Sequence, residues 1–133
     1  MKSIIKLAAL CILVGSVFAL YVFFAGVSLT LENQSGQQIH DVEIKYGRGT
    51  FFTDIVPDKE IRKKSLGKIG EGATFDVTWQ ESSGRIRQTQ FSVYFYGYSG
   101  YVSILIRILP NGEAVLYEGE QQYKPNSLSD SST

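Results

Sequence analysis

The chain has 133 residues, with 13 basic and 13 acidic side chains, one His and one Cys. Lys2 and Lys6 precede an apolar run, so 11 basic and 13 acidic residues follow them, a net charge of −2 (11 − 13). This balance argues against a nucleic-acid-binding protein, which would carry a basic patch. The only thiol, Cys11, lies inside the apolar run, so the remainder of the chain has no disulfide and must be stabilised by packing.

The first predicted element is a membrane-spanning helix. Leu7–Val27 contains 21 residues without a charge, twelve of them Leu, Ile, Val or Phe. A helix of that length rises about 32 Å, which matches the thickness of a bilayer core. Because Lys2 and Lys6 lie on the short N-terminal side, the positive-inside tendency leaves the N-terminus in the cytoplasm. Residues 1–27 are therefore expected to be a single-pass signal-anchor, with the domain outside the cytoplasm, or periplasmic in a bacterium.

Cleavage of this segment is the main alternative. Val17 and Ala19 flank Phe18 in a small-x-small type of site, so cleavage near Ala19 would release a secreted protein. The apolar run continues past that site to Gly26, whereas the apolar part of a signal peptide normally has about 7 to 15 residues. A lipoprotein signal ending at Cys11 is disfavoured because Leu10 is bulky where a small residue is expected. We therefore expect the anchor to be retained.

Small residues recur every fourth position in the predicted span, at Cys11, Gly15 and Ala19. They share one stripe of the helix and would permit close approach of another membrane helix. Chance spacing explains the same pattern, since small residues are common in membrane helices.

A period of two, typical of half-buried strands, replaces the apolar run after Val27. The alternating sets are Val27, Leu29 and Leu31; Val42, Ile44 and Tyr46; and Phe75, Val77 and Trp79. Residues 28–120 are thus predicted to form an all-β, antiparallel sandwich of six or seven strands, immunoglobulin-like or transthyretin-like. We expect one or two short strands and long loops in Gly47–Gly72, and a disordered tail over residues 121–133.

The last long hairpin is predicted in most detail. Ile86 is out of phase with Phe91, which predicts a β-bulge or a crossing between sheets around Gln88 to Gln90. A loop at Gly97–Gly100 would pair the two flanking strands, with Phe91, Val93 and Phe95 on the core face beside Val102, Ile104 and Ile106. The opposite face would then gather a tyrosine patch, the predicted partner-binding site, made of Tyr94, Tyr96, Tyr98 and Tyr101.

The sequence offers little material for catalysis or cofactor binding. His40 is the sole histidine and shares the phase of Val42, so we expect it at the rim of a sheet. The lack of further His, Cys or Met after residue 27 argues against a metal site, and no cofactor motif is present.

Two further patterns concern the surface. A basic run from Lys59 to Lys68 is interpreted as a solvated loop or a headgroup-binding patch, and Asn33 begins a glycosylation sequon. The carboxylate pairs Asp41 with Glu43, and Glu118 with Glu120, are expected to face solvent.

These observations predict a protein without enzymatic activity. The favoured function is a membrane-anchored envelope protein whose sandwich is a binding or accessory module within a membrane-associated complex, with a protein partner and no nucleic acid. The alternative is a secreted or periplasmic sandwich that binds a small ligand or glycan, for which Trp79 would be the natural stacking residue. Trp79 shares the phase of Phe75 and Val77, however, and we expect it in the core.

Overall fold

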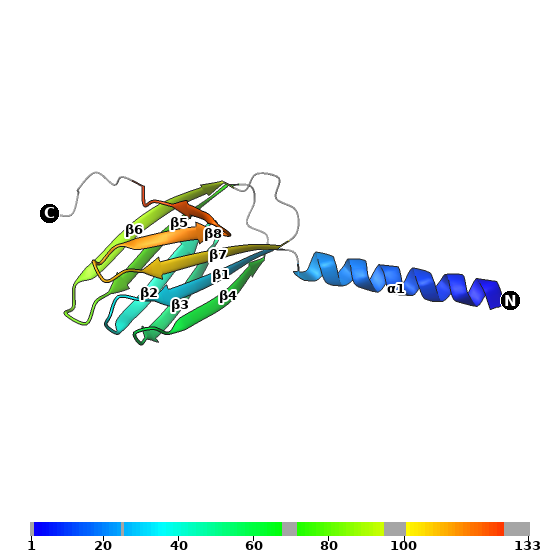
Figure 1. The fold of residues 1–133 in the computed structure, drawn as a ribbon, viewed down its shortest axis with the longest axis horizontal. Helices are drawn as coiled ribbons and strands as arrows, with labels where there is room; N and C mark the ends of the chain where they lie inside the picture. The colour runs from blue at the N-terminus through cyan, green and yellow to red at the C-terminus, as the bar shows by residue number, and fades with distance from the viewer. Residues whose placement is uncertain (1, 25, 68–71, 95–100, 127–133) are drawn as a thin grey trace.

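The computed structural model describes residues 2–24, 26–67, 72–94 and 101–126. Within these ranges one apolar helix precedes a mostly β-stranded domain built from two sheets (Figure 1). The elements in chain order are α1 (Lys2–Phe24), β1 (Gly26–Asn33), β2 (Ile39–Tyr46), β3 (Gly49–Val56), β4 (Ile61–Gly67), β5 (Gly72–Gln80), β6 (Ile86–Tyr94), β7 (Tyr101–Ile108), β8 (Ala114–Glu118) and β9 (Gln121–Tyr123).

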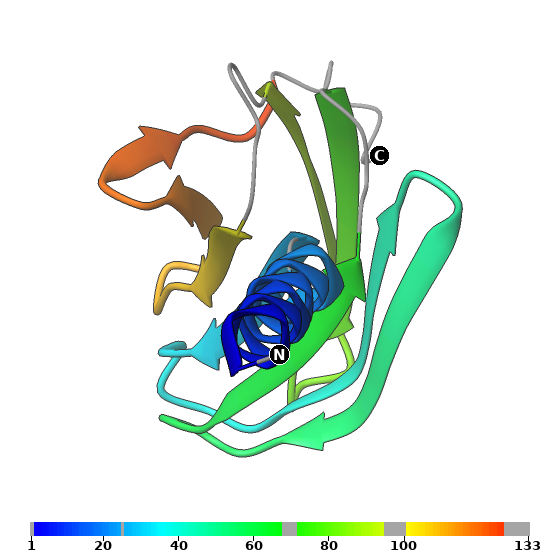
Figure 2. The ribbon, with the colours of Figure 1, turned by 90° about the vertical axis from the view of Figure 1, so that its right-hand side faces the viewer.

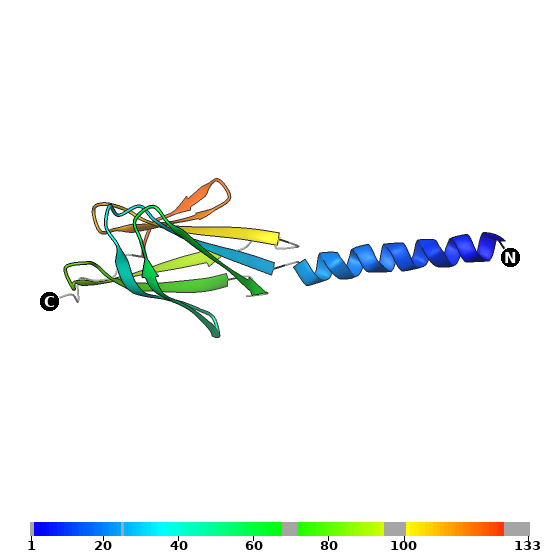
Figure 3. The same cartoon turned by 90° about the horizontal axis from the view of Figure 1, so that it is seen from below.

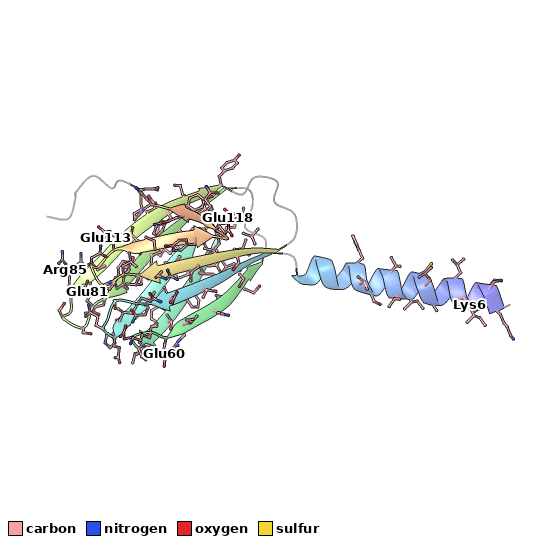
Figure 4. The ribbon with its side chains drawn as sticks, in the orientation of Figure 1. Lys6, Glu60, Glu81, Arg85, Glu113 and Glu118 are labelled. Atoms are coloured by element: carbon pink, nitrogen blue, oxygen red, sulfur yellow. The ribbon has the colours of Figure 1, made fainter. Side chains whose placement is uncertain are left out.

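The helix α1 projects from the end of the sheets at which β1 begins (Figure 1). Its side chains from Lys2 to Ala19 are exposed, and Lys6 lies near its free end (Figure 4). It is long and apolar enough to cross a membrane, a property that an N-terminal signal sequence shares. The helix ends at Phe24 rather than at the expected Val27, because Val27 is buried in the core as part of β1.

The strands form a five-stranded sheet in the order β4-β1-β7-β8-β9 and a four-stranded sheet in the order β3-β2-β5-β6. We call these sheet 1 and sheet 2. Neighbouring strands are antiparallel with one exception, because β1 runs parallel to β7 with Gly26 beside Tyr101 and Asn33 beside Ile108. The two layers are visible edge-on in Figure 3. The architecture is therefore sandwich-like, with one internal parallel pair.

The core lies between the sheets and uses the alternation that the sequence predicts. Trp79 is only 2% exposed and is among the largest buried side chains, as expected. The principal inward-facing residues of sheet 1 are Val27, Leu29, Leu31, Ile104, Ile106, Ile108, Ala114 and Leu116. Those of sheet 2 are Ile39, Val42, Ile44, Tyr46, Phe51, Val56, Phe75, Val77, Trp79, Phe91 and Val93.

The predicted hairpin of β6 with β7 is wrong, because these strands belong to different sheets. Its core residues Phe91, Val93, Ile104 and Ile106 are buried as expected. They reach the core from opposite layers instead of sharing one face. The reason is that β7 pairs with β1 and β8, while β6 pairs with β5. The expected loop falls outside the described residues.

The bulge predicted in β6 is also misplaced. The β5–β6 register is unbroken from Gly72 opposite Tyr94 to Gln80 opposite Ile86. Ile86 simply faces solvent, at 69% exposure, while Thr89 takes the buried position. The register shifts instead in β2 between His40 and Glu43, where Asp41 has φ 49°, and in β1 between Val27 and Ser28. Aspartate tolerates this left-handed conformation better than most residues.

Basic side chains close the side of the sandwich formed by the edge strands β3 and β4. Arg62 donates a hydrogen bond to the carbonyl of Ile55 at 3.2 Å, and Lys64 donates one to the carbonyl of Thr50 at 3.3 Å. Inward-pointing charges of this kind discourage a sheet edge from pairing with another chain. Part of the basic run thus stabilises the fold, and Gly47–Gly72 contributes two strands, within the predicted number, joined by a short turn at residues 57–60.

The opposite side is closed by residues that were expected to be a disordered tail. Gln121–Tyr123 forms β9 against β8, and Tyr123 donates a hydrogen bond to Glu118 at 3.0 Å. Asn126 then reaches β6, where its backbone N–H donates to the carbonyl of Gln90 at 2.8 Å. The folded domain therefore extends to Asn126 rather than to residue 120.

Trp79→Ala is expected to destabilise the domain by roughly 3 to 5 kcal/mol, because it leaves a large cavity between the sheets. The measurement is urea-induced unfolding of wild type and variant. Ile86→Ala is the matched control, since Ile86 is exposed on the neighbouring strand. It should change stability by no more than about 0.5 kcal/mol. Equal stability of wild type and Trp79→Ala would contradict the burial of the indole.

Candidate functional site

The structure places the strands of two of the four predicted tyrosines, Tyr94 and Tyr101, in different sheets. Tyr94 ends β6 in sheet 2 and is 51% exposed, whereas Tyr101 begins β7 in sheet 1 beside Gly26. The hairpin from which the patch was inferred is therefore not formed. Tyr96 and Tyr98 lie outside the described residues, so the gathering of the four rings stays a prediction. What the structure adds is that β7 begins beside the start of β1, at the end of the sandwich from which the helix projects (Figures 1 and 2).

The residues considered for catalysis do not converge in the described part of the chain. His40 is half-buried near the start of β2, with Gln38 Nε2 lying 3.3 Å from its Nε2 atom. Glu43 is 3.5 Å from the ammonium group of Lys45, while the neighbouring Asp41 is exposed at the bulge. Across residues 2–24, 26–67, 72–94 and 101–126, no three His, Cys, Asp or Glu side chains cluster as metal ligands.

Asn33, the acceptor of the predicted sequon, has a structural role. Its side chain is fully buried, and its Nδ2 donates to the carbonyl of Gln37 at 2.7 Å and to that of Val56 at 2.9 Å. Its Oδ1 accepts from the hydroxyl and the backbone N–H of Ser35. A glycan on Nδ2 is incompatible with these bonds, so the folded domain does not present Asn33 as an acceptor.

A hollow of about 390 Å³ opens on the outer face of sheet 1. It lies over β7 and β8 and is lined by Ser103, Leu105, Arg107, Tyr117 and Gly119. The β7 members alternate with the core residues of that strand, so the pleat sends them outward. We call this surface the sheet 1 hollow.

The guanidinium of Arg107 is the most organised group in the sheet 1 hollow. Its Nε donates to Glu32 Oε2 at 3.0 Å from the adjacent strand β1, where Glu32 and Arg107 are register partners. Its Cζ lies 5.4 Å from the centre of the Tyr117 ring, within range of a cation–π contact. Gln34 also donates to Glu32, at the other carboxylate oxygen. The arginine is thus held by an ion pair on one side and an aromatic ring on the other.

A second hollow, of about 280 Å³, lies on sheet 2 beside the β2–β3 turn. Its charged lining residues, Lys45 and Asp76, are register partners on adjacent strands. The sheet 1 hollow is larger, and it sets an aromatic ring beside its charged group. We therefore regard the sheet 1 hollow as the better candidate site.

Sequence reasoning missed this site for a physical reason. Arg107 alternates with Ile106 and Ile108, and this pattern predicts only that it faces outward. Its partner Glu32 is 75 residues away, and the two meet because β1 lies parallel to β7. A parallel pair between the first and seventh strands leaves no local mark in the sequence.

Comparisons with known proteins give no functional assignment. No protein-family model matches the chain, and no curated protein is similar to it. A solved structure described as the NMR structure of the protein from Eubacterium rectale is 16% identical, with a TM-score of 0.44. The similarity covers 71% of this chain and 89% of that one.

Asn33→Asp should make the stability of the domain depend on pH. An ionised carboxylate would face the carbonyls of Gln37 and Val56 without a proton to donate, so burial raises its folded pKa above the unfolded value. The variant is then most stable below the unfolded pKa and loses stability as the pH rises through the folded pKa. The measurement is the free energy of unfolding in urea, for variant and wild type, at about pH 4.5 and about pH 8. The loss of stability of the variant relative to wild type should be larger at the higher pH by at least about 2 kcal/mol. A constant difference between the two proteins would contradict the buried position.

Proposed function

We propose that this protein is a non-enzymatic, membrane-anchored envelope protein whose β-sandwich is a binding or accessory module of a membrane-associated complex. The observation that carries this proposal is the direct junction of α1 with β1. The apolar helix ends at Phe24, and an internal strand of sheet 1 begins at Gly26. So short a junction would hold the sandwich close to the membrane surface.

We propose that the helix is retained and that the N-terminus is cytoplasmic. Lys2 and Lys6 support this orientation through the positive-inside tendency. Cleavage near Ala19 would leave apolar residues of the same run, from Leu20 to Phe24, at the start of the mature chain. Cys11, Gly15 and Ala19 provide a small-residue stripe for packing against a helix of the complex.

Of the two sandwich types expected from the sequence, we favour the transthyretin-like one. Immunoglobulin constant-type sandwiches place their first, second, fifth and fourth strands in one sheet and the third, sixth and seventh in the other. Here β1 lies between β4 and β7, and β2 belongs to the other sheet. This order argues against the immunoglobulin-like type.

The proposed working surface is the sheet 1 hollow. Arg and Tyr are enriched among the residues that contribute most to protein interfaces, and Arg107 and Tyr117 lie together there. The tyrosines Tyr94, Tyr96, Tyr98 and Tyr101 remain a second predicted partner-binding site. Because Tyr101 lies beside Gly26, that site would act close to the membrane.

The alternative function is binding of a small ligand or a glycan by a secreted or periplasmic domain. Its strongest sequence argument was a stacking role for Trp79, and the burial of that indole removes it. What remains in its favour is the size of the sheet 1 hollow, which falls in the range of small-molecule sites.

The full-length protein should remain with membranes after high-salt and carbonate washes, because the retained helix would cross the bilayer. The measurement is fractionation of expressing cells, with N-terminal sequencing of the membrane-bound form. A soluble chain that begins at Leu20 would contradict the anchor and favour the secreted alternative. Recovery of a defined complex in mild detergent, identified by mass spectrometry, would support the accessory role, whereas a partner-free protein that binds sugar arrays would contradict it.

A further inference from the structure

We propose that Arg107 in the sheet 1 hollow recognises the carboxylate of an acidic side chain on a protein partner. The inference rests on the proposed function, since it names the chemistry by which the binding module would recognise its partner. Its evidence is the fixed position of Arg107, the unused donors on its guanidinium and the open shape of the surface around it.

Arg107 is positioned before any partner binds. The carboxylate of Glu32 accepts a hydrogen bond from Nε, and the ring of Tyr117 lies beside the guanidinium. These contacts restrict the side chain, whose exposed fraction is 31%. A side chain already restricted in this way loses less conformational entropy on binding than a free surface arginine.

The donors left on Arg107 suit a carboxylate. Within the part of the chain that the structure describes, its hydrogen bond is made by Nε, and the two terminal nitrogens, Nη1 and Nη2, make none. The fork of an arginine matches the two oxygens of a carboxylate in planar, charge-assisted geometry. Lys63 occupies the outward row of β4 at the register of Thr30 and Leu105, which adds positive charge to this face.

The shape of the surface favours a protein partner over a free small molecule. Small-molecule sites usually bury about 70 to 90% of their ligand, and the sheet 1 hollow is open. Ser28 and Ser103 are register partners on its outer face, so short side chains would let a partner's backbone approach closely. Leu105 and Tyr117 supply apolar contact beside the charge.

A purely structural role for the Glu32–Arg107 pair predicts different behaviour. In that case the pair would only join β1 to β7, and added carboxylates would not affect it. The two roles are distinguished by a probe that carries a carboxylate and a matched probe that lacks one.

The test is a titration of the full-length protein in detergent micelles. Binding is monitored through the NMR signal of the Arg107 Nε–H group. The probes are the acetylated, amidated tripeptides Leu-Glu-Leu and Leu-Gln-Leu. We expect the glutamate peptide to shift the signal saturably and the glutamine peptide to bind at least about tenfold more weakly. Arg107→Lys, assayed through the Tyr117 ring signals, should weaken binding of the glutamate peptide by about tenfold, because an ammonium group cannot form the fork.

Arg85→Gln is the matched control, because Arg85 is an exposed arginine at the end of the sandwich away from the helix (Figure 4). It should leave binding unchanged, and circular dichroism should show that both variants fold. Equal binding of the two peptides, or unchanged binding by Arg107→Lys, would overturn the proposal. Acetate that binds as tightly as the glutamate peptide would overturn the protein-partner assignment. Membrane retention and recovery of a complex are measured with the wild-type protein and do not depend on binding of the peptide by Arg107. A negative peptide titration would therefore overturn the role of Arg107 without overturning the proposed function.

Discussion

The fold depends on the insertion of β1 between β4 and β7. This strand follows the apolar helix directly and, like β7, it pairs in both directions, antiparallel to β4 and parallel to β7. Its inward side chains Leu29 and Leu31 are fully buried, and Asn33 at its end binds the carbonyl of Val56 in the opposite sheet. Removing β1 would separate sheet 1 into two parts and expose the core. The position of β1 also fixes which end of the sandwich faces the helix.

Polar contacts close the sandwich at the places where apolar packing ends. On one side, Arg62 and Lys64 reach carbonyl groups of β3, and on the other, Asn126 binds β6. These contacts satisfy backbone groups that edge strands leave unpaired. The absence of a disulfide in the domain is compatible with this arrangement, because β9 and the segment that follows it hold the last edge in place.

The arrangement separates two ends with different surroundings. Glu81, Arg85 and Glu113 lie at the end away from the helix, whereas Glu118 lies toward the helix (Figure 4). The sheet 1 hollow extends along the side between these ends, over β7 and β8. If α1 spans a bilayer, a partner in the same membrane could therefore approach this face from the side.

The sequence by itself determined the apolar helix, the strand alternation and the burial of Trp79. Each is a local property, set by the polarity of neighbouring residues. Strand pairing was decided only by the tertiary structure. Phe91 and Ile104 face the core in either a hairpin or a sandwich crossing, so their pattern cannot distinguish the two. Likewise Arg107 meets Glu32 only because β1 lies beside β7, a contact that burial of both inner faces enforces.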